Sequence, residues 1–238
     1  MLFNDQVNEI HLNDIDRSIW TFWDAILNNT DAFIDRINNT EITMDEWYQQ
    51  RHIQQNKDDF NDFDLAFSSF FLNRTNRSGI ILKAGVIGGY GQAGEYKLDC
   101  RFNKAGLIRR IELIRQYRHR IHLYNQDAVD FINHTNQFLP ENSLYCIDPP
   151  YYVKGSTLYT NFYRPEDHKQ LADTILELER PWILTYDNSP EIQKLYPNQP
   201  QYRFNLNYSA AKKCKGTELL ITSDDINICE TLELMDAL

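Results

Sequence analysis

One short stretch of the chain joins an apolar segment to a carboxylate, two prolines and an aromatic ring. The segment 144–147 is followed directly by Asp148, Pro149, Pro150 and Tyr151. Proline fixes φ and has no backbone N–H, and the second proline pushes the first towards extended geometry, so a strand cannot continue through the pair. We therefore predict a fully buried, central strand that ends in a stiff loop. Open α/β sheets bind their ligands at this carboxyl end of a strand.

The predicted loop suits the activation of a planar amine. The carboxylate of Asp148 and the bare carbonyl of Pro149 can each accept one N–H group of an exocyclic amine, and the ring of Tyr151 offers a stacking surface. Such an amine is a poor nucleophile because its lone pair is delocalised into the base. Two acceptors draw the nitrogen towards a tetrahedral, attacking form. The alternative is an ordinary turn after a core strand, since aspartate and proline are common turn residues.

The sequence D-P-P-Y resembles the catalytic motif of the D12-class, Dam-like, adenine-specific DNA methyltransferases. The resemblance extends over residues 13–222 and implies catalytic roles for Asp148, Pro149, Pro150 and Tyr151. It also implies S-adenosylmethionine as the cofactor, double-stranded DNA as the partner, a flipped adenine and no metal. Three alternatives stay open: methylation of another planar amide or base, DNA binding by an inactive relative, and a binding module independent of DNA.

The implied fold is α/β, a Rossmann-like S-adenosylmethionine-dependent methyltransferase sheet with a small, mostly helical DNA-recognition insertion. We expect residues 1–59 and 121–238 to form the catalytic domain and 60–120 to form the insertion. Apolar runs predict further strands at 9–12, 120–124, 182–185, 203–206 and 218–222. Helical spacing predicts helices near 19–26, 31–34, 44–48, 65–71, 107–118, 128–135 and 167–178, with a polar connector at 54–64.

Acidic residues follow two of the predicted strands, where a nucleotide ribose or base could bind. The segment Asn-Asp-Ile-Asp that ends at Asp16 resembles the ribose-binding motif of the family, with Asp14 at its principal position. Asp127 and Ala128 correspond to the family's contact with the adenine of the cofactor, and Asp148 also borders the cofactor. Asp14, Asp16 and Asp127 could each instead cap the helix that follows.

The glycine-rich loop of the family, an F-x-G-x-G type motif, has no match upstream of Asn13. Because that loop shapes the methionine end of the cofactor site, we expect the 238-residue chain to bind S-adenosylmethionine weakly, with a dissociation constant of about 1 mM. The later glycines, at 85–94, lack a leading strand and a following helix. Their spacing instead predicts short extended pieces arranged as a hairpin.

The charge distribution predicts a DNA-facing surface on an acidic protein. The net charge is −10, yet residues 74–120 carry 11 basic and 3 acidic side chains. A segregated basic segment is typical of a nucleic-acid interface, although a solvated helix face would also explain it. The predicted DNA contacts are Arg74, Arg77, Lys83, Arg101, Lys104, Arg109, Arg110, Lys154, Tyr159 and Asn161. The last three resemble the family's cover over an extruded base.

Composition excludes several other classes of protein. No run of about 18 apolar residues exists, and the first residues have no signal-peptide pattern, so we expect a cytoplasmic protein without membrane contact. The four cysteines have no C-x-x-C spacing, which predicts reduced thiols and no zinc site. We expect a monomer, with exposed sheet edges as a route to self-association.

Overall fold

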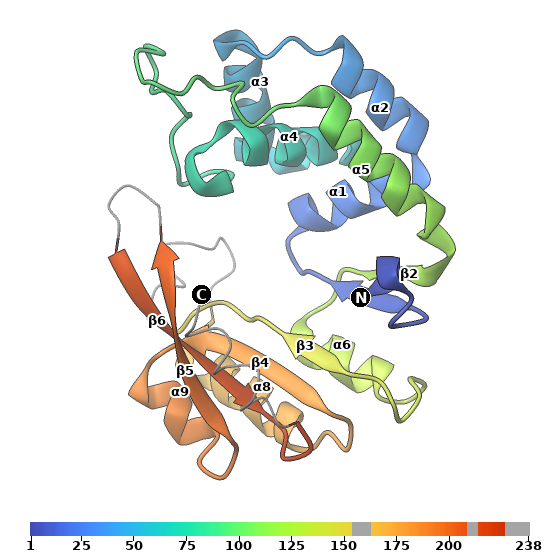
Figure 1. Cartoon of the computed structure of the whole chain (residues 1–238), viewed down its shortest axis with the longest axis vertical. Coiled ribbons are helices and arrows are strands. Elements are labelled where there is room, and N and C mark those ends of the chain that lie inside the picture. Colours follow the sequence, from blue (N-terminus) through green and yellow to red (C-terminus); the bar gives the residue numbers. More distant parts are fainter. Residues whose placement is uncertain (154–162, 209–213, 227–238) are drawn as a thin grey trace. The chain divides into compact units, whose positions relative to one another are not determined.

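The computed structural model describes residues 1–153, 163–208 and 214–226, and it divides the chain into two compact units, Met1–Asp127 and Ala128–Leu238 (Figure 1). The two units together have a mixed α/β composition. Within the described residues, no helix has both the length and the apolar character needed to span a bilayer. Lys154, Tyr159 and Asn161 lie outside the described residues.

The first unit is built mainly of helices around one that is buried on all sides. Its helices are α1 (Arg17–Asn28), α2 (Thr30–Asn39), α3 (Met44–Gln55), α4 (Asp62–Thr75) and α5 (Lys104–Gln116), with short 3-10 helices η1 (Leu2–Asn4), η2 (Lys57–Asp59), η3 (Arg77–Gly79) and η4 (Arg118–Arg120). Residues 65–72 of α4 are all buried, as expected of a helix that is apolar around its whole circumference. Helix α4 accordingly packs against both α1 and α3.

Aromatic rings fill the space between these helices. Phe33 of α2 lies 5.8 Å from Phe67 and 5.5 Å from Phe70, measured between ring centroids, and all three side chains are buried. Edge-to-face contacts of this kind stabilise a core beyond the area that they bury. Trp47 of α3 is fully buried, and its indole N–H donates to Asn76 Oδ1 at 2.7 Å. This bond fixes the end of α4 and the start of the loop that follows.

A two-stranded parallel sheet completes the first unit. Strand β1 (Ile10–Asn13) pairs with β2 (Ile121–Tyr124), and His11 lies opposite His122. Past the strand ends, the side chain of Asn13 donates to the carbonyl of Gln126 and accepts from its amide, both at 3.0 Å. The predicted strands at 9–12 and 120–124 are confirmed within one residue.

The second unit is a four-stranded sheet with helices. The strands are β3 (Tyr145–Ile147), β4 (Trp182–Asp187), β5 (Gln201–Tyr208) and β6 (Cys214–Thr222), in the order β3-β4-β6-β5. The β3–β4 pair is parallel, and the β4–β6 and β5–β6 pairs are antiparallel. The helices are α6 (Ala128–Thr135), α8 (Pro165–Leu176) and α9 (Pro190–Leu195). Alternate residues of β4, among them Leu184 and Tyr186, enter a core shared with Leu171 and Ile175 of α8.

Three details of the predicted framework are wrong. Strand β3 is neither fully buried nor central: Cys146 is exposed, and β3 forms an edge of the sheet in the described part of the chain. The glycine segment 85–94 forms turns, with one isolated bridge between Asn76 and Val86, and no hairpin. The stretch 54–64 is a connector only in part, because it includes η2 and the start of α4.

The side chain of Gln92 explains why the glycine segment closes into turns. Its amide donates to the carbonyls of Ile87 and Gly89, at 2.8 and 2.7 Å, and its Oε1 accepts from the amide of Leu98 at 2.9 Å. Gly88 has a φ of +84°, and a Cβ there would lie 2.7 Å from the carbonyl oxygen of Tyr96. The glycines therefore permit a compact turn instead of separating extended strands.

Candidate active site and DNA interface

The loop that contains Asp148 and the two prolines is held in place by the end of the neighbouring strand. Asp187, the last residue of β4, accepts hydrogen bonds from the amide of Tyr152 at 2.7 Å and from the amide of Val153 at 2.8 Å, one on each carboxylate oxygen. Charge-assisted bonds of this kind are stronger than neutral ones. Asp187 was not among the predicted site residues, although it follows the predicted strand 182–185 by only two residues.

Asp148 lies just beyond β3, exposed but with its carboxylate crowded by protein atoms. The hydroxyl of Thr185 donates to its Oδ1 at 2.7 Å. Partial burial raises the pKa of Asp148; the bond from Thr185 lowers it, and the negative charge of Glu218 raises it further. One carboxylate oxygen is thus held in a fixed position while the other is left for a ligand, an arrangement that can accept an N–H group.

The two residues that flank the second proline differ in their contacts. Tyr151 donates its hydroxyl hydrogen to Glu218 Oε1 at 2.6 Å, and Glu218 is only 6% exposed on β6. Pro149 is buried, and its carbonyl has no hydrogen-bond donor among the described residues. A carbonyl oxygen without a donor in the protein has a lone pair that a ligand N–H can use.

A buried histidine packs beneath the same loop. His168 of α8 is 1% exposed, its Nδ1 lies 2.9 Å from the hydroxyl oxygen of Tyr186, and its ring centroid lies 5.0 Å from that of Tyr152. Burial lowers the pKa of His168, although Asp187 and Asp167 act in the opposite direction. The ring is therefore neutral near pH 7 and fills the space under the loop without adding charge.

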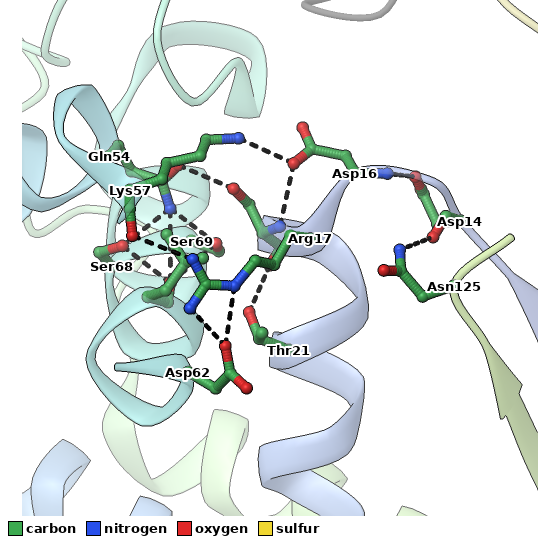
Figure 2. Close-up of polar contacts among 12 residues, drawn as sticks. Asp14, Asp16, Arg17, Thr21, Gln54, Lys57, Asp62, Ser68, Ser69 and Asn125 are labelled. Atoms are coloured by element: carbon green, nitrogen blue, oxygen red, sulfur yellow. Dashed lines mark hydrogen bonds and ion pairs between the residues drawn. The ribbon is translucent and has the colours of Figure 1, made fainter. Parts of the chain in front are cut away.

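In the first unit, the acidic turn after β1 contains two aspartates with different roles (Figure 2). Asp14 Oδ1 accepts from the amide of Asp16 at 2.8 Å, and the side chain of Asn125 donates to the carbonyl of Asp14 at 2.7 Å. Among the described residues, Asp14 Oδ2 has no donor. Burial raises the pKa of Asp14, with the amide of Asp16 and the charge of Lys57 opposing it. This desolvated oxygen can accept a hydroxyl hydrogen from a ligand.

Asp16 differs from Asp14 in accepting two hydrogen bonds on one oxygen, one of them from a charged group. Its Oδ1 accepts from the amide of Ser18 at 2.9 Å and from the ammonium of Lys57 at 2.8 Å, so it caps α1 (Figure 2). Burial alone would raise the pKa of Asp16, but the hydrogen bonds from Lys57 and Ser18 hold it below its usual value. The capping alternative is thus confirmed for Asp16. Its predicted part in cofactor binding stays a prediction.

A buried polar network supports the acidic turn at Asp14 and Asp16. Ser18 donates to Gln54 Oε1 at 3.1 Å, and the amide of Gln54 donates to the hydroxyls of Ser68 and Ser69 at 2.7 and 2.8 Å (Figure 2). Arg17 bridges to Asp62 Oδ1 at 2.6 Å. The start of α1 is therefore tied to α3 and α4, which fixes the acidic turn that precedes it.

Three arginines of the basic segment lie close together without an acidic partner among the described residues. Burial lowers the pKa of Arg74, and the positive charges of Arg101 and Arg110 lower it further. The Nε of Arg74 is buried and has no hydrogen-bond partner among the described residues. We call Arg74, Arg101 and Arg110 the arginine cluster. Mutual repulsion and an unsatisfied donor both favour the binding of an anion such as a phosphate.

Comparison with known proteins decides the family. The family model of the D12 class N6 adenine-specific DNA methyltransferases matches residues 1–212. The chain belongs to this D12 family. No curated protein matches the chain significantly. The D12 assignment confirms the predicted family and identifies DNA as the substrate class of the family.

The other basic residues of this D12 chain differ in how far they are engaged. The ammonium of Lys104 donates to the carbonyls of Asn38 and Thr40 at the end of α2, at 2.9 and 2.7 Å, and so stabilises that helix. Arg115 pairs with Asp31. The residues Arg77, Lys83, Arg109 and Arg110 are exposed. Except for Arg115, which was not predicted to bind DNA, contact of these residues with DNA stays a prediction. The role of Asp127 and Ala128, at the start of α6, also stays a prediction.

Proposed function

We propose that the chain transfers a methyl group from S-adenosylmethionine to the exocyclic N6 amine of adenine in double-stranded DNA, with the base flipped out of the stack. The observation that carries this proposal is the loop at Asp148. Its carboxylate is positioned by Thr185, and the Pro149 carbonyl beside it has no donor among the described residues. Membership of the D12 family supports the reaction class.

In this proposal the Asp148 carboxylate and the Pro149 carbonyl each accept one N–H of the target amine. Their combined pull draws the nitrogen lone pair out of conjugation with the ring. As the nitrogen becomes tetrahedral, its N–H bonds polarise towards the two oxygens, and these hydrogen bonds strengthen in the transition state. Tyr151, anchored through its hydroxyl on Glu218, stacks on the base. Asp187 and His168 keep the loop in this arrangement.

The cofactor supplies the reactive methyl group when bound. The residues of the first unit fit one part of it: the desolvated Oδ2 of Asp14 is suited to a ribose hydroxyl. We assign Asp127 and Ala128 to the adenine of the cofactor by family resemblance. A Rossmann-like sheet and a DNA-recognition insertion at 60–120 are part of the same proposal.

The arginine cluster is proposed to bind phosphates of the DNA backbone. Three cations without an acidic partner among the described residues are well suited to phosphate oxygens. Flipping a base costs a few kcal/mol, which contacts to the backbone and stacking in the pocket would offset. Arg77, Lys83, Lys104, Arg109, Lys154, Tyr159 and Asn161 complete the proposed DNA surface.

A methyl-transfer assay on unmethylated DNA tests the proposal. We expect transfer to adenine N6 that is abolished by Asp148→Ala, whereas Asp130→Ala, at an exposed position of α6, serves as the matched control and leaves the rate unchanged. DNA binding should persist in both variants, since the arginine cluster belongs to the first unit. A tenth or more of the wild-type rate in Asp148→Ala would refute the catalytic assignment. Salt-dependent DNA binding without any transfer by the wild type would favour a weak or inactive methyltransferase that still binds DNA.

A further inference from the structure

Two histidines and a glutamate meet on one face of the small sheet in the first unit. His11 and His122 occupy opposite positions of β1 and β2, and their rings stack with centroids 4.5 Å apart and planes 20° apart. Glu9 Oε2 lies 3.0 Å from His122 Nε2 and 3.9 Å from His11 Nε2. One ligand atom from each residue lies within 4.8 Å of the other two.

Tyr124 can orient the ring of His11 for metal binding. The hydroxyl oxygen of Tyr124 lies 3.0 Å from His11 Nδ1. When Nδ1–H donates to this oxygen, the lone pair of the His11 ring is on Nε2, the nitrogen nearer to Glu9. Histidines that bind metals are usually oriented by such a bond from their other ring nitrogen. The cluster therefore has ligand atoms and an orienting group, and the stacked rings must rotate for both Nε2 lone pairs to point at one ion.

We propose that Glu9, His11 and His122 bind a divalent transition-metal ion, with Zn²⁺ as the best fit. Two imidazole nitrogens and one carboxylate oxygen form a ligand set that suits zinc, whereas Mg²⁺ and Ca²⁺ prefer oxygen ligands. The side chain of Glu9 is 56% exposed, that of His122 40% and that of His11 15%. The ion can thus enter from solvent, and water can occupy a fourth coordination position.

An ion at this site would connect Glu9 and strand β1 to strand β2. A two-stranded sheet is marginal by itself in water, so a shared ligand set on both strands adds to its stability. Glu9 precedes β1, while His11 and His122 lie on different strands, so the ion would connect three positions of the backbone. The competing reading is an ordinary ion pair between Glu9 and His122 that holds no metal.

Calorimetric titration of the metal-stripped chain with ZnCl₂ near pH 7 tests the proposal. We expect one ion per chain with micromolar or tighter affinity and a higher melting temperature. His11→Ala and His122→Ala should each weaken binding at least tenfold, and Tyr124→Phe about tenfold. His52→Ala is the matched control: this exposed histidine of α3 bonds to Asn56, away from the cluster, and its loss should leave the affinity unchanged.

The imidazole resonances of the wild type provide a second test that needs no variant. Zinc should shift the signals of His11 and His122 and leave those of His52 in place. Binding no tighter than millimolar, equal affinity in the His122→Ala variant, or equal shifts at all three histidines would overturn the proposal and leave the ion pair as the explanation.

Discussion

Replacing Asp187 by asparagine tests whether the end of β4 holds the catalytic loop. The carboxylate accepts the amides of Tyr152 and Val153, one on each oxygen. Asparagine keeps a single acceptor and turns an NH₂ group towards the other amide, so Asp187→Asn removes one bond and the charge that strengthens the other. A hydrogen bond to a charged group contributes about 1.5–3 kcal/mol. Water can replace much of the bond at Val153, which is exposed.

We therefore expect the loop to lose about 2 kcal/mol of stabilisation, which corresponds to roughly a 30-fold higher population of the open loop. Native-state amide hydrogen exchange measures this directly: the Tyr152 amide should exchange about 30-fold faster in Asp187→Asn. Asp173→Asn, at an exposed position of α8, is the control with the same chemical change. Exchange at Tyr152 within twofold of the wild type would refute the reasoning and mean that the prolines alone hold the loop.

Two further predictions concern charges that the structure fixes. Lys57→Met should destabilise the fold by about 1–2 kcal/mol at pH 7, because it leaves the partly buried Asp16 with fewer donors. The pKa of Asp16 is depressed in the folded state, so this contribution is present above its unfolded pKa and disappears as the pH falls below about 4. Urea unfolding at pH 7 and pH 3 measures the loss of stability. An equal loss in the exposed Lys169→Met variant would contradict the prediction. Glu218→Gln removes a negative charge near Asp148 and should lower the pKa of Asp148, measured by carbon NMR of its carboxyl group; a rise or no change would exclude the proposed coupling.

The parts of the site that could be predicted are those that are contiguous in the sequence. Asp148 and its two prolines are neighbours, and the proline backbone restricts their geometry regardless of the rest of the fold. Thr185 and Glu218 could not be identified in this way, because strand pairing brings them to the loop from 37 and 67 residues away. The amphipathic helix patterns likewise depend on local spacing, and helix α6 has the predicted bounds of 128–135.

The hairpin predicted for the glycine segment is wrong because one side chain determines the backbone conformation there. Nothing in the spacing of the glycines indicates that Gln92 will bond to Ile87, Gly89 and Leu98 and close a turn. The prediction of no zinc site rested on cysteine spacing, and it stays a prediction. His11 and His122 lie more than a hundred residues apart and meet only through the parallel register of their strands. A cluster of this kind is visible only after the strand pairing is known.

The reciprocal bonds between Asn13 and Gln126 join residues 113 positions apart, which constrains the order of events during synthesis. At about 5–20 residues per second, roughly 6–23 s separate the emergence of the two partners from the ribosome. Helices α1 to α5 depend on nearer contacts and can form during that interval, whereas β1 has no strand to pair with until β2 emerges. Closing so large a loop is entropically costly and slow. Strand β1, which emerges long before its partner β2, is thus among the last parts of the first unit to fold.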